Sequence, residues 1–379
     1  MRKKHFLFAS VLALLCGSST LHAQDFKLTS SGYFKNQGVD VMAFDDIYPE
    51  GHQGGVCIIM NGHRVATNGD IRLEATPGQW QPVPKQLDRK LGDNSITATL
   101  CYPDSSRHLT GFNPMIYPDL HLIYTVNVES KGKNIEVTVD LDRPIPQEFI
   151  GKVGFNLEFF PGSLFGKPWI MDGQSGIFPQ QPNSPLMTTQ PNYLHTGNYH
   201  DGKKSLADMD KLIGKGYSPI VADDIISEPY AKGTKFTSRP DDPYNKVTIE
   251  SLSGDLQLFD GRMNHNNGWF VLRSNIKPGV TKGAVKWIIT PNVVADWMYQ
   301  PVIQTSQIGY HPTQDKEAVI EMDIRDNRKE TAQIIRIDAD GEKVVKNVTP
   351  ANWGKFLRYN YLKVDFTDVK EPGLYKIKY

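Results

Sequence analysis

The chain has 379 residues, which is long enough for two or three domains with hydrophobic cores of their own. Basic (Lys and Arg) and acidic (Asp and Glu) residues number 42 each, so the formal net charge is zero. This balance argues against nucleic acid or an anionic membrane surface as a partner. The 32 glycines, 25 prolines and 10% aromatic residues favour a β-rich protein with many turns over a helical bundle.

The N-terminus has the features of an export signal. A basic head at residues 1–4 precedes a short apolar run at residues 6–16, which is too short to span a membrane. Ala23 offers a small side chain for cleavage, so we expect residues 1–23 to be a signal peptide. Cys16 is an alternative site of lipidation. We expect a secreted or periplasmic protein without a transmembrane segment, and a lipid anchor in the outer membrane is the less favoured alternative.

Two further cysteines, Cys57 and Cys101, lie inside apolar runs. Export makes a disulfide between them possible. A free cysteine in an apolar run also behaves as a small buried hydrophobic residue. Both alternatives stay open at this point, and neither cysteine has the surroundings of a catalytic nucleophile.

From residue 24 to about residue 300 the sequence predicts a large antiparallel β-sandwich. Apolar and polar residues alternate along short segments, which is typical of strands with one buried face. Asn61-Gly62 between two apolar runs predicts a tight hairpin turn. The predicted strands lie in residues 55–67, 96–103, 120–142, 151–160, 268–275 and 283–290.

The periodicity fades between residues 161 and 244, where Pro, Asn, Gln, Asp and Gly dominate. Long irregular connections of this kind are often functional or disordered. One helix is expected within it, because Ser205 can cap a segment whose apolar residues share a face and Gly214 can end it.

Residues 301–379 predict a second, smaller unit with short strands at the spacing of an immunoglobulin-like sandwich. Asp340-Gly341 is the expected turn of one hairpin, and residues 374–379 read as a strand. The predicted organisation is therefore a signal peptide at 1–23, a β-sandwich domain at 24–300 and an immunoglobulin-like module at 301–379. The fold class is all-β.

The second unit resembles the immunoglobulin-like module at the front of cellulases of glycoside hydrolase family nine. The residues that carry the resemblance are "QIGYHP" at 307–312, "KEA" at 316–318, "DFT" at 365–367 and "GLY" at 373–375. Residues 61–84 and 155–169 look, more loosely, like the extra β-domain of some multidomain members of that family.

The resemblance implies that a last strand of the module and an all-helical catalytic barrel follow, and we expect both to lie outside this chain. The family hydrolyses β-glucans with inversion, using a carboxylic acid and a carboxylate base. Its base motif reads Asp-Ala-Gly-Asp. The "DADG" at residues 338–341 has a different order and sits between alternating strands, so we interpret it as a turn. No catalytic residue of the family therefore carries over to this chain.

Binding of glycans needs exposed flat rings, whose apolar faces match the C–H surfaces of a pyranose. The candidates for stacking on a glycan lie in loop-like contexts, and the alternative for each is packing within its own sandwich. They are Trp80, Trp169, Tyr193 and Tyr199. Trp269 and Trp287 are expected in the core.

Three aromatic residues of the module are candidates for docking against a catalytic barrel, again with packing in the module's own core as the alternative. They are Tyr310, Trp353 and Tyr361. An uncovered docking surface, or an unpaired strand edge, would favour self-association.

The function that these features predict is the non-catalytic N-terminal portion of a secreted β-glucan hydrolase of the cellulase type. A stand-alone carbohydrate-binding protein is the first alternative. A sugar-active enzyme in residues 24–300 is the second, with acid–base candidates His195, His200, Asp201 and Glu228. We expect no cofactor and no metal site, and the possible partners are a β-glucan polysaccharide and a catalytic barrel.

Overall fold

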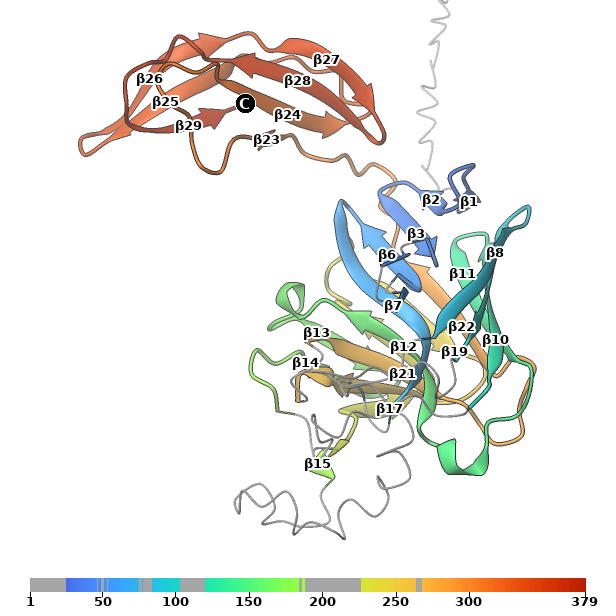
Figure 1. The fold of residues 1–379 in the computed structure, drawn as a ribbon. Helices are drawn as coiled ribbons and strands as arrows, with labels where there is room; N and C mark the ends of the chain where they lie inside the picture. The colour runs from blue at the N-terminus through green and yellow to red at the C-terminus, as the bar shows by residue number, and fades with distance from the viewer. Residues whose placement is uncertain are drawn as a thin grey trace, which may run out of the picture.

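The computed structural model describes residues 25–45, 47–48, 51–52, 54–74, 77, 84–102, 120–183, 186–187, 226–263 and 268–379. Its regular structure within these ranges consists of β-strands and three short 3-10 turns, and no α-helix occurs there. The all-β prediction is confirmed. The helix expected around residues 205–214 falls outside the described residues. Figure 1 shows the chain as two lobes, with the C-terminus in the smaller one.

The larger lobe, which we call the large domain, contains two antiparallel sheets of nine strands each. Sheet 1 runs, in spatial order, β1 (Lys27–Leu28), β2 (Phe34–Asn36), β3 (Val39–Ala43), β6 (Val56–Met60), β7 (His63–Leu73), β12 (Val153–Phe159), β21 (Phe270–Asn275), β20 (Leu256–Asp260) and β17 (Ala231–Gly233). Sheet 2 runs β14 (Gln174–Ile177), β13 (Pro168–Met171), β18 (Lys235–Ser238), β19 (Val247–Ser251), β22 (Val285–Pro291), β11 (Asn134–Leu141), β10 (Ile123–Lys131), β9 (Ser95–Cys101) and β8 (Lys85–Leu91).

Short elements complete the large domain. Two small ribbons are formed by β4 (Ile47–Tyr48) with β5 (Gly51–His52) and by β15 (Leu186–Met187) with β16 (Ile226–Ser227). The 3-10 turns are η2 (Gln147–Phe149), η3 (Pro161–Ser163) and η4 (Gly261–Met263).

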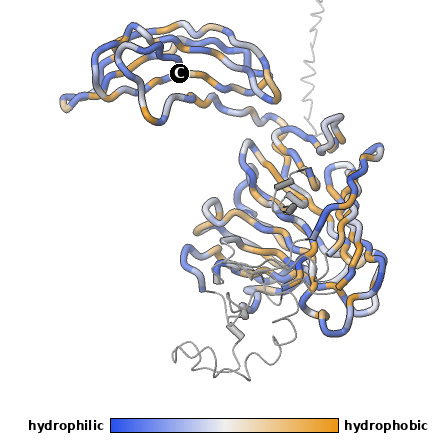
Figure 2. The backbone as a smooth tube through the Cα atoms, viewed as in Figure 1, coloured by the Kyte–Doolittle hydropathy of each residue, from blue (hydrophilic) through white to orange (hydrophobic). Residues whose placement is uncertain are grey.

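The two sheets of the large domain bury their apolar faces against each other, as the alternation in the sequence predicts. Along β10, β11 and β22 every second residue is buried. Rings from both sheets meet in the core: Phe155 of β12 contacts Trp287 of β22 edge to face, with centroids 4.9 Å apart. Figure 2 shows hydrophobic residues recurring along these strands.

The smaller lobe is a two-sheet sandwich of seven strands, the immunoglobulin-like (Ig-like) module. One sheet has the order β23 (Val302–Gln304), β24 (Glu317–Asp323), β28 (Tyr359–Asp365) and β27 (Ala351–Phe356). The other has the order β26 (Gly341–Val348), β25 (Ala332–Asp338) and β29 (Leu374–Lys378). Its separate core contains Ala318, Ile320, Met322, Ala332, Ile334, Leu362, Val364 and Phe366.

Two expected hairpins form. Asn61 and Gly62 have φ of 51° and 84° in the turn between β6 and β7, which is the left-handed pair that a tight hairpin of this kind needs. In the other hairpin Asp338 pairs with Gly341, so its turn consists of Ala339 and Asp340, one residue earlier than expected.

Cys57 and Cys101 do not form a disulfide with each other. Cys57 is buried in β6 of sheet 1, while Cys101 is partly exposed in β9 of sheet 2. Of the two alternatives that the sequence left open, the structure therefore has cysteines without a disulfide between them. Burial raises the pKa of the Cys101 thiol, so this group is a poor nucleophile at neutral pH.

Candidate functional site

Five aromatic rings form a continuous row from the connection between the domains across the outer face of the Ig-like module. Successive ring centroids are 6.3, 5.0, 6.0 and 5.6 Å apart, at tilted or edge-to-face angles that aromatic pairs favour. We call this row the aromatic strip, and in order it contains Trp297, Tyr299, Tyr359, Tyr361 and Trp353.

Local backbone geometry explains why the strip faces outward. In β28 the side chains of Leu362 and Val364 are buried, so the alternation places Tyr359 and Tyr361 on the opposite face. A bulge in β27 makes Trp353 the extra residue, because Asn352 and Gly354 pair with consecutive residues of β28. Bulges of this kind re-aim a side chain, and here the indole ring reaches Tyr361 with 56% of Trp353 exposed.

A single carboxylate supports the strip from the neighbouring strand. Glu321 of β24 accepts hydrogen bonds from the hydroxyls of Tyr299 (2.9 Å) and Tyr361 (3.2 Å), one on each of its oxygens. Burial raises the pKa of both phenols, and the hydrogen bonds and negative charge of Glu321 raise it further. Both tyrosines therefore stay protonated, and their rings are held in place by their hydroxyls.

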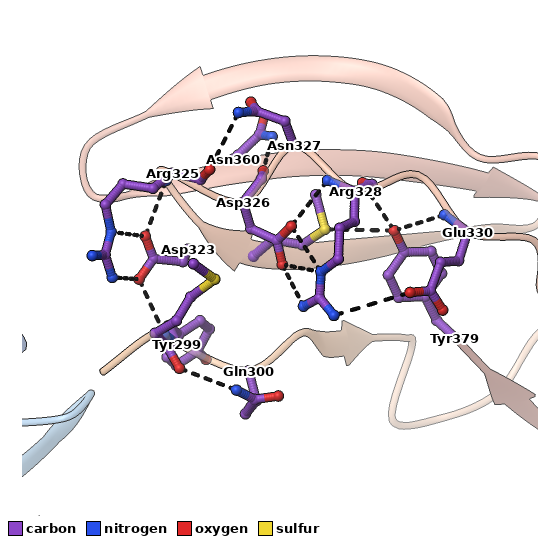
Figure 3. A network of polar contacts seen from close by, with 12 residues as sticks. Tyr299, Gln300, Asp323, Arg325, Asp326, Asn327, Arg328, Glu330, Asn360 and Tyr379 are labelled. Atoms are coloured by element: carbon purple, nitrogen blue, oxygen red, sulfur yellow. Dashed lines mark hydrogen bonds and ion pairs between the residues drawn. The ribbon is translucent and has the colours of Figure 1, made fainter. Parts of the chain in front are cut away.

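The connection between the domains is fixed by a second carboxylate, drawn in Figure 3. Asp323 accepts a hydrogen bond from the backbone N–H of Tyr299 (3.0 Å) and two from the guanidinium of Arg325 (2.8 and 3.0 Å). Burial alone would raise the pKa of Asp323, but these hydrogen bonds outweigh it and lower the pKa to about 2. Arg325 also donates to the carbonyl oxygen of Trp297 (2.6 Å).

Figure 3 also shows how Tyr379, directly after β29, is attached to the same loop. The hydroxyl of Tyr379 donates to the carbonyl of Arg328 and accepts from the backbone N–H of Glu330, both at 3.2 Å. Arg328 in turn pairs with Asp326 at 2.6 Å. The loop from Asp323 to Glu330 thus ties the end of β29, in one sheet of the module, to β24 in the sheet that carries the strip.

The large domain contributes contacts from the other side of the connection. Arg358, in the turn between β27 and β28, forms an ion pair of 2.8 Å with Asp40 of β3. Gln37 donates to the carbonyl of Trp297 at 2.7 Å. Burial raises the pKa of Asp40, partly offset by the positive charge of Arg358. We call this meeting of Asp40, Trp297, Tyr299 and Arg358 the junction.

A separate cluster of charged residues lies in sheet 1 of the large domain. Glu74, next to the end of β7, accepts hydrogen bonds from Asn156 and from Arg273 (3.1 Å), and all three side chains are buried. Burial raises the pKa of Glu74 to about 7, although Arg273 and Asn156 lower it and Glu158 raises it further. The second carboxylate oxygen of Glu74 has no hydrogen-bond partner.

Sequence reasoning missed this cluster, although a signal was present. Asp70, Arg72 and Glu74 alternate within "GDIRLEA", a pattern that puts three charged side chains on one strand face. Asp70 is buried as well, and it accepts hydrogen bonds from the hydroxyl of Tyr124 at 3.0 and 3.2 Å. Arg273 is 199 residues distant from Glu74 in the sequence, and only the fold brings the two together.

Of the four residues expected to stack on glycans, the structure describes Trp169. Trp169 is only 7% exposed and belongs to the core of the large domain, where it packs over Gly176 of the neighbouring strand. Trp169 therefore packs within its own sandwich, which was the alternative to stacking on a glycan. Trp80, Tyr193 and Tyr199 lie outside the described residues.

The docking candidates separate into two groups. Trp353 and Tyr361 meet in the strip, whereas Tyr310 packs on Phe366 at the edge of the module's core, with centroids 5.2 Å apart. The Tyr310 hydroxyl donates to the carbonyl of Glu317 at 2.8 Å. Tyr310 is therefore partly buried and packs against the module's own core.

Of the acid–base candidates, Glu228 is exposed and the other three, His195, His200 and Asp201, lie outside the described residues. Among the residues that the structure describes, no three or more His, Cys, Asp or Glu side chains gather in a way that could hold a metal ion. The same residues include no helix long and apolar enough to cross a membrane.

The fold and the position of the strip define an immunoglobulin-like module with an outward aromatic face. Residues 298–379 match the family model described as the cellulase N-terminal Ig-like domain. No curated protein matches the chain.

Two solved structures align with most of the chain at low similarity. The Slr1438 protein from Synechocystis sp. PCC 6803 is 11% identical with a TM-score of 0.31, over 71% of this chain and 96% of that one. The HI1317 protein is 9% identical with a TM-score of 0.28, over 66% and 98%. Similarity at this level supports no inference about the large domain.

Proposed function

We propose that this chain is the non-catalytic part of a secreted β-glucan hydrolase of the cellulase type, and that its Ig-like module docks a catalytic domain through the aromatic strip. The observation that carries the proposal is the match of residues 298–379 to the cellulase N-terminal Ig-like domain. The catalytic domain belongs either to the same polypeptide or to a partner chain.

The outer face of the module has the residue composition of a protein-docking surface. Trp353 and Phe356 are each 56% exposed in β27, and Leu357 in the adjoining turn is 79% exposed. Large exposed apolar side chains that lie together mark sites of protein contact, and tryptophan and tyrosine supply much of the energy at such sites. The ion pair between Lys363 and Glu317, 2.8 Å on the same sheet, provides a polar rim.

The Ig-like module itself offers no acid–base pair of the kind that glycoside hydrolysis needs. The "DADG" segment closes the hairpin between β25 and β26, where Asp338 pairs with Arg336 at 2.9 Å and Asp340 is exposed. A carboxylic acid and a carboxylate base must flank a bound sugar with room for water. A hairpin tip provides no such site, which agrees with hydrolytic residues that lie in the docked domain.

The test combines this chain with a separately produced catalytic domain of glycoside hydrolase family nine. The chain alone is expected to release no sugar from carboxymethyl-cellulose or xyloglucan. It is expected to bind the catalytic domain and raise its melting temperature. Trp353→Ala should abolish this effect, while Val345→Ala, an exposed apolar residue of β26 in the other sheet, should retain it. Hydrolysis by the chain alone, or failure to bind, would contradict the proposal.

Export is part of the same proposal and rests on the sequence of residues 1–23. The mass of the protein isolated from its own cells is the measurement that decides it. A mature N-terminus at Gln24 agrees with secretion into the periplasm or the medium, whereas a diacylglycerol on Cys16 would establish the anchored alternative. An unprocessed Met1 would contradict export.

A further inference from the structure

We propose that the junction between the two domains is a binding site for one sugar unit of a β-glucan chain. This inference rests on the proposed function, since that function supplies the class of glycan. It adds a site, because the family match covers only the Ig-like module while the junction also uses residues of the large domain.

A cavity of about 170 Å³ lies at the junction. Its walls come from the turn between β2 and β3, from the connection between the domains and from the turn between β27 and β28. A cavity needs about 10–15 Å³ to hold one water-sized atom. The cavity at the junction therefore has room for about a dozen such atoms. A single hexopyranose ring has about that many non-hydrogen atoms, whereas a drug-sized ligand would need a larger pocket.

Three rings of the aromatic strip line this cavity: Trp297, Tyr299 and Tyr359. The Tyr299 and Tyr359 centroids are 5.0 Å apart and the two planes are inclined by 52°, so the rings do not stack on each other. The hydroxyl of Tyr299 is engaged by Glu321, which directs the polar edge of this ring to the module. The three rings are half-buried, and the apolar surface that they contribute to the cavity wall suits the C–H surface of a pyranose ring.

Polar groups beside the rings suit the hydroxyl groups of a sugar. Arg358 and Asp40 are paired in the cavity wall, and 46% of the Arg358 side chain and 15% of the Asp40 side chain are exposed. The guanidinium group has more N–H donors than this ion pair uses, and the carboxylate has further lone pairs. Neighbouring sugar hydroxyls each donate and accept, so a paired donor and acceptor can bind two of them together.

The charges in the cavity wall favour a neutral ligand. Arg358 is paired with Asp40, and Arg325 is paired with Asp323. The remaining charged group in the lining, Lys35, also faces Asp40 and lowers the pKa of that carboxyl. A charged ligand that bound to either pair would have to break it, whereas a neutral sugar adds hydrogen bonds to both pairs.

The full chain is the protein to test, with cellohexaose as the probe and isothermal titration calorimetry as the measurement. We expect saturable binding at millimolar or lower concentration. Arg358→Ala and the isosteric Asp40→Asn should each weaken it by about tenfold, because a hydrogen bond to a charged group is lost. Lys355→Ala is the matched control, since this exposed basic residue lies on the same hairpin and outside the cavity.

Four outcomes would decide the inference. Binding that Arg358→Ala and Asp40→Asn weaken and Lys355→Ala does not would support it, provided that circular dichroism shows all variants folded. Absence of saturable binding, or binding that both cavity variants leave unchanged, would overturn it. Equal binding of maltohexaose would overturn the assignment to β-glucan. None of these results depends on docking of a catalytic domain, which Trp353→Ala tests separately, so a failure of the proposed function is distinguishable.

Discussion

The rings of Trp353 and Tyr361 meet edge to face on the outer surface of the Ig-like module, with centroids 5.6 Å apart and planes inclined by 88°. The two residues lie on neighbouring strands, and the bulge in β27 is what brings them together. The hydrogen bond to Glu321 fixes the Tyr361 ring, and this ring holds the more exposed indole of Trp353 in place. A rigid aromatic pair of this kind loses little side-chain entropy when a partner covers it.

The first prediction concerns self-association through Trp353 and Tyr361. In the absence of a catalytic domain the purified chain should self-associate through the aromatic strip, because an uncovered apolar patch favours association. Trp353→Ala should shift the sedimentation-velocity distribution toward the monomer and change the free energy of unfolding by less than about 1 kcal/mol, as expected for an exposed residue. Val345→Ala is the control and should leave the distribution unchanged. A wild-type chain that stays monomeric at high concentration would contradict the prediction.

The second prediction concerns the packing of the junction. Gly38 has φ of 66°, and a Cβ atom there would lie 2.7 Å from Cε3 of the Trp297 ring. Gly279 has a similar φ of 75° and nothing within 4 Å of its Cβ position. Both substitutions by Ala therefore incur backbone strain, but only Gly38→Ala also displaces the indole. We expect Gly38→Ala to lower the free energy of unfolding by about 1–3 kcal/mol more than Gly279→Ala does.

Chemical denaturation of both variants, followed by near-ultraviolet circular dichroism, measures this difference. The junction variant should also lose near-ultraviolet signal, because Trp297 is displaced from its place beside Tyr299. Equal destabilisation by the two glycine substitutions would mean that Trp297 does not pack on the large domain as it does in this structure.

Much of the fold could be predicted from local patterns. Alternation of apolar and polar residues located the central strands of the large domain and those of the Ig-like module, since a strand with one buried face has a period of two. It missed β13, β14, β17 and β18, which lie within residues 161–244, where an irregular connection was expected. Asn61-Gly62 fixed a hairpin by its backbone preference alone. The family-like motif around Gly309-Tyr310 pointed to the module that the family model matches. Each of these signals depends on neighbours in the sequence.

The site was harder to predict because it depends on residues that are distant in the sequence. Trp169 follows Gly-Lys-Pro and suggested an exposed loop, but it lies in β13 and fills the space left by the missing side chain of Gly176. Tyr310, Trp353 and Tyr361 were grouped as docking residues by their residue type. Only the pleat of β28 and the bulge in β27 bring Trp353 and Tyr361 together on the outer face, whereas Tyr310 packs against the module's core.

The third prediction distinguishes packing from glycan stacking at Trp169. Its ring is buried in the core, so Trp169→Ala should lower the free energy of unfolding by about 3–5 kcal/mol. The neighbouring Ile170 is 40% exposed on the other face of the same strand, and Ile170→Ala should cost less than about 1 kcal/mol. Urea denaturation measures both. A Trp169→Ala chain of nearly unchanged stability but reduced binding to β-glucan would restore the stacking role.

The last prediction concerns the buried Glu74 and the pH dependence of stability. Its pKa is about 7 in the folded chain, against an ordinary value of 4.5, so the folded state binds the proton more tightly than the unfolded state does. Stability should therefore fall as the pH rises from about 4.5 to about 7 and then level off, with a contribution of about 3 kcal/mol. Above that range Glu74 is ionised and its charge is compensated by Arg273.

Urea denaturation of the wild type and of Glu74→Gln at a series of pH values isolates this contribution from those of other carboxyl groups. The free energy of unfolding of the variant should decline less between pH 4.5 and pH 7 than that of the wild type. Glu250→Gln is the control, because Glu250 is 46% exposed at its side chain and pairs only loosely with Lys235 at 3.9 Å. This control should follow the wild-type curve. If Glu74→Gln follows it as well, the pKa of Glu74 does not differ between the folded and unfolded states, which would contradict the prediction.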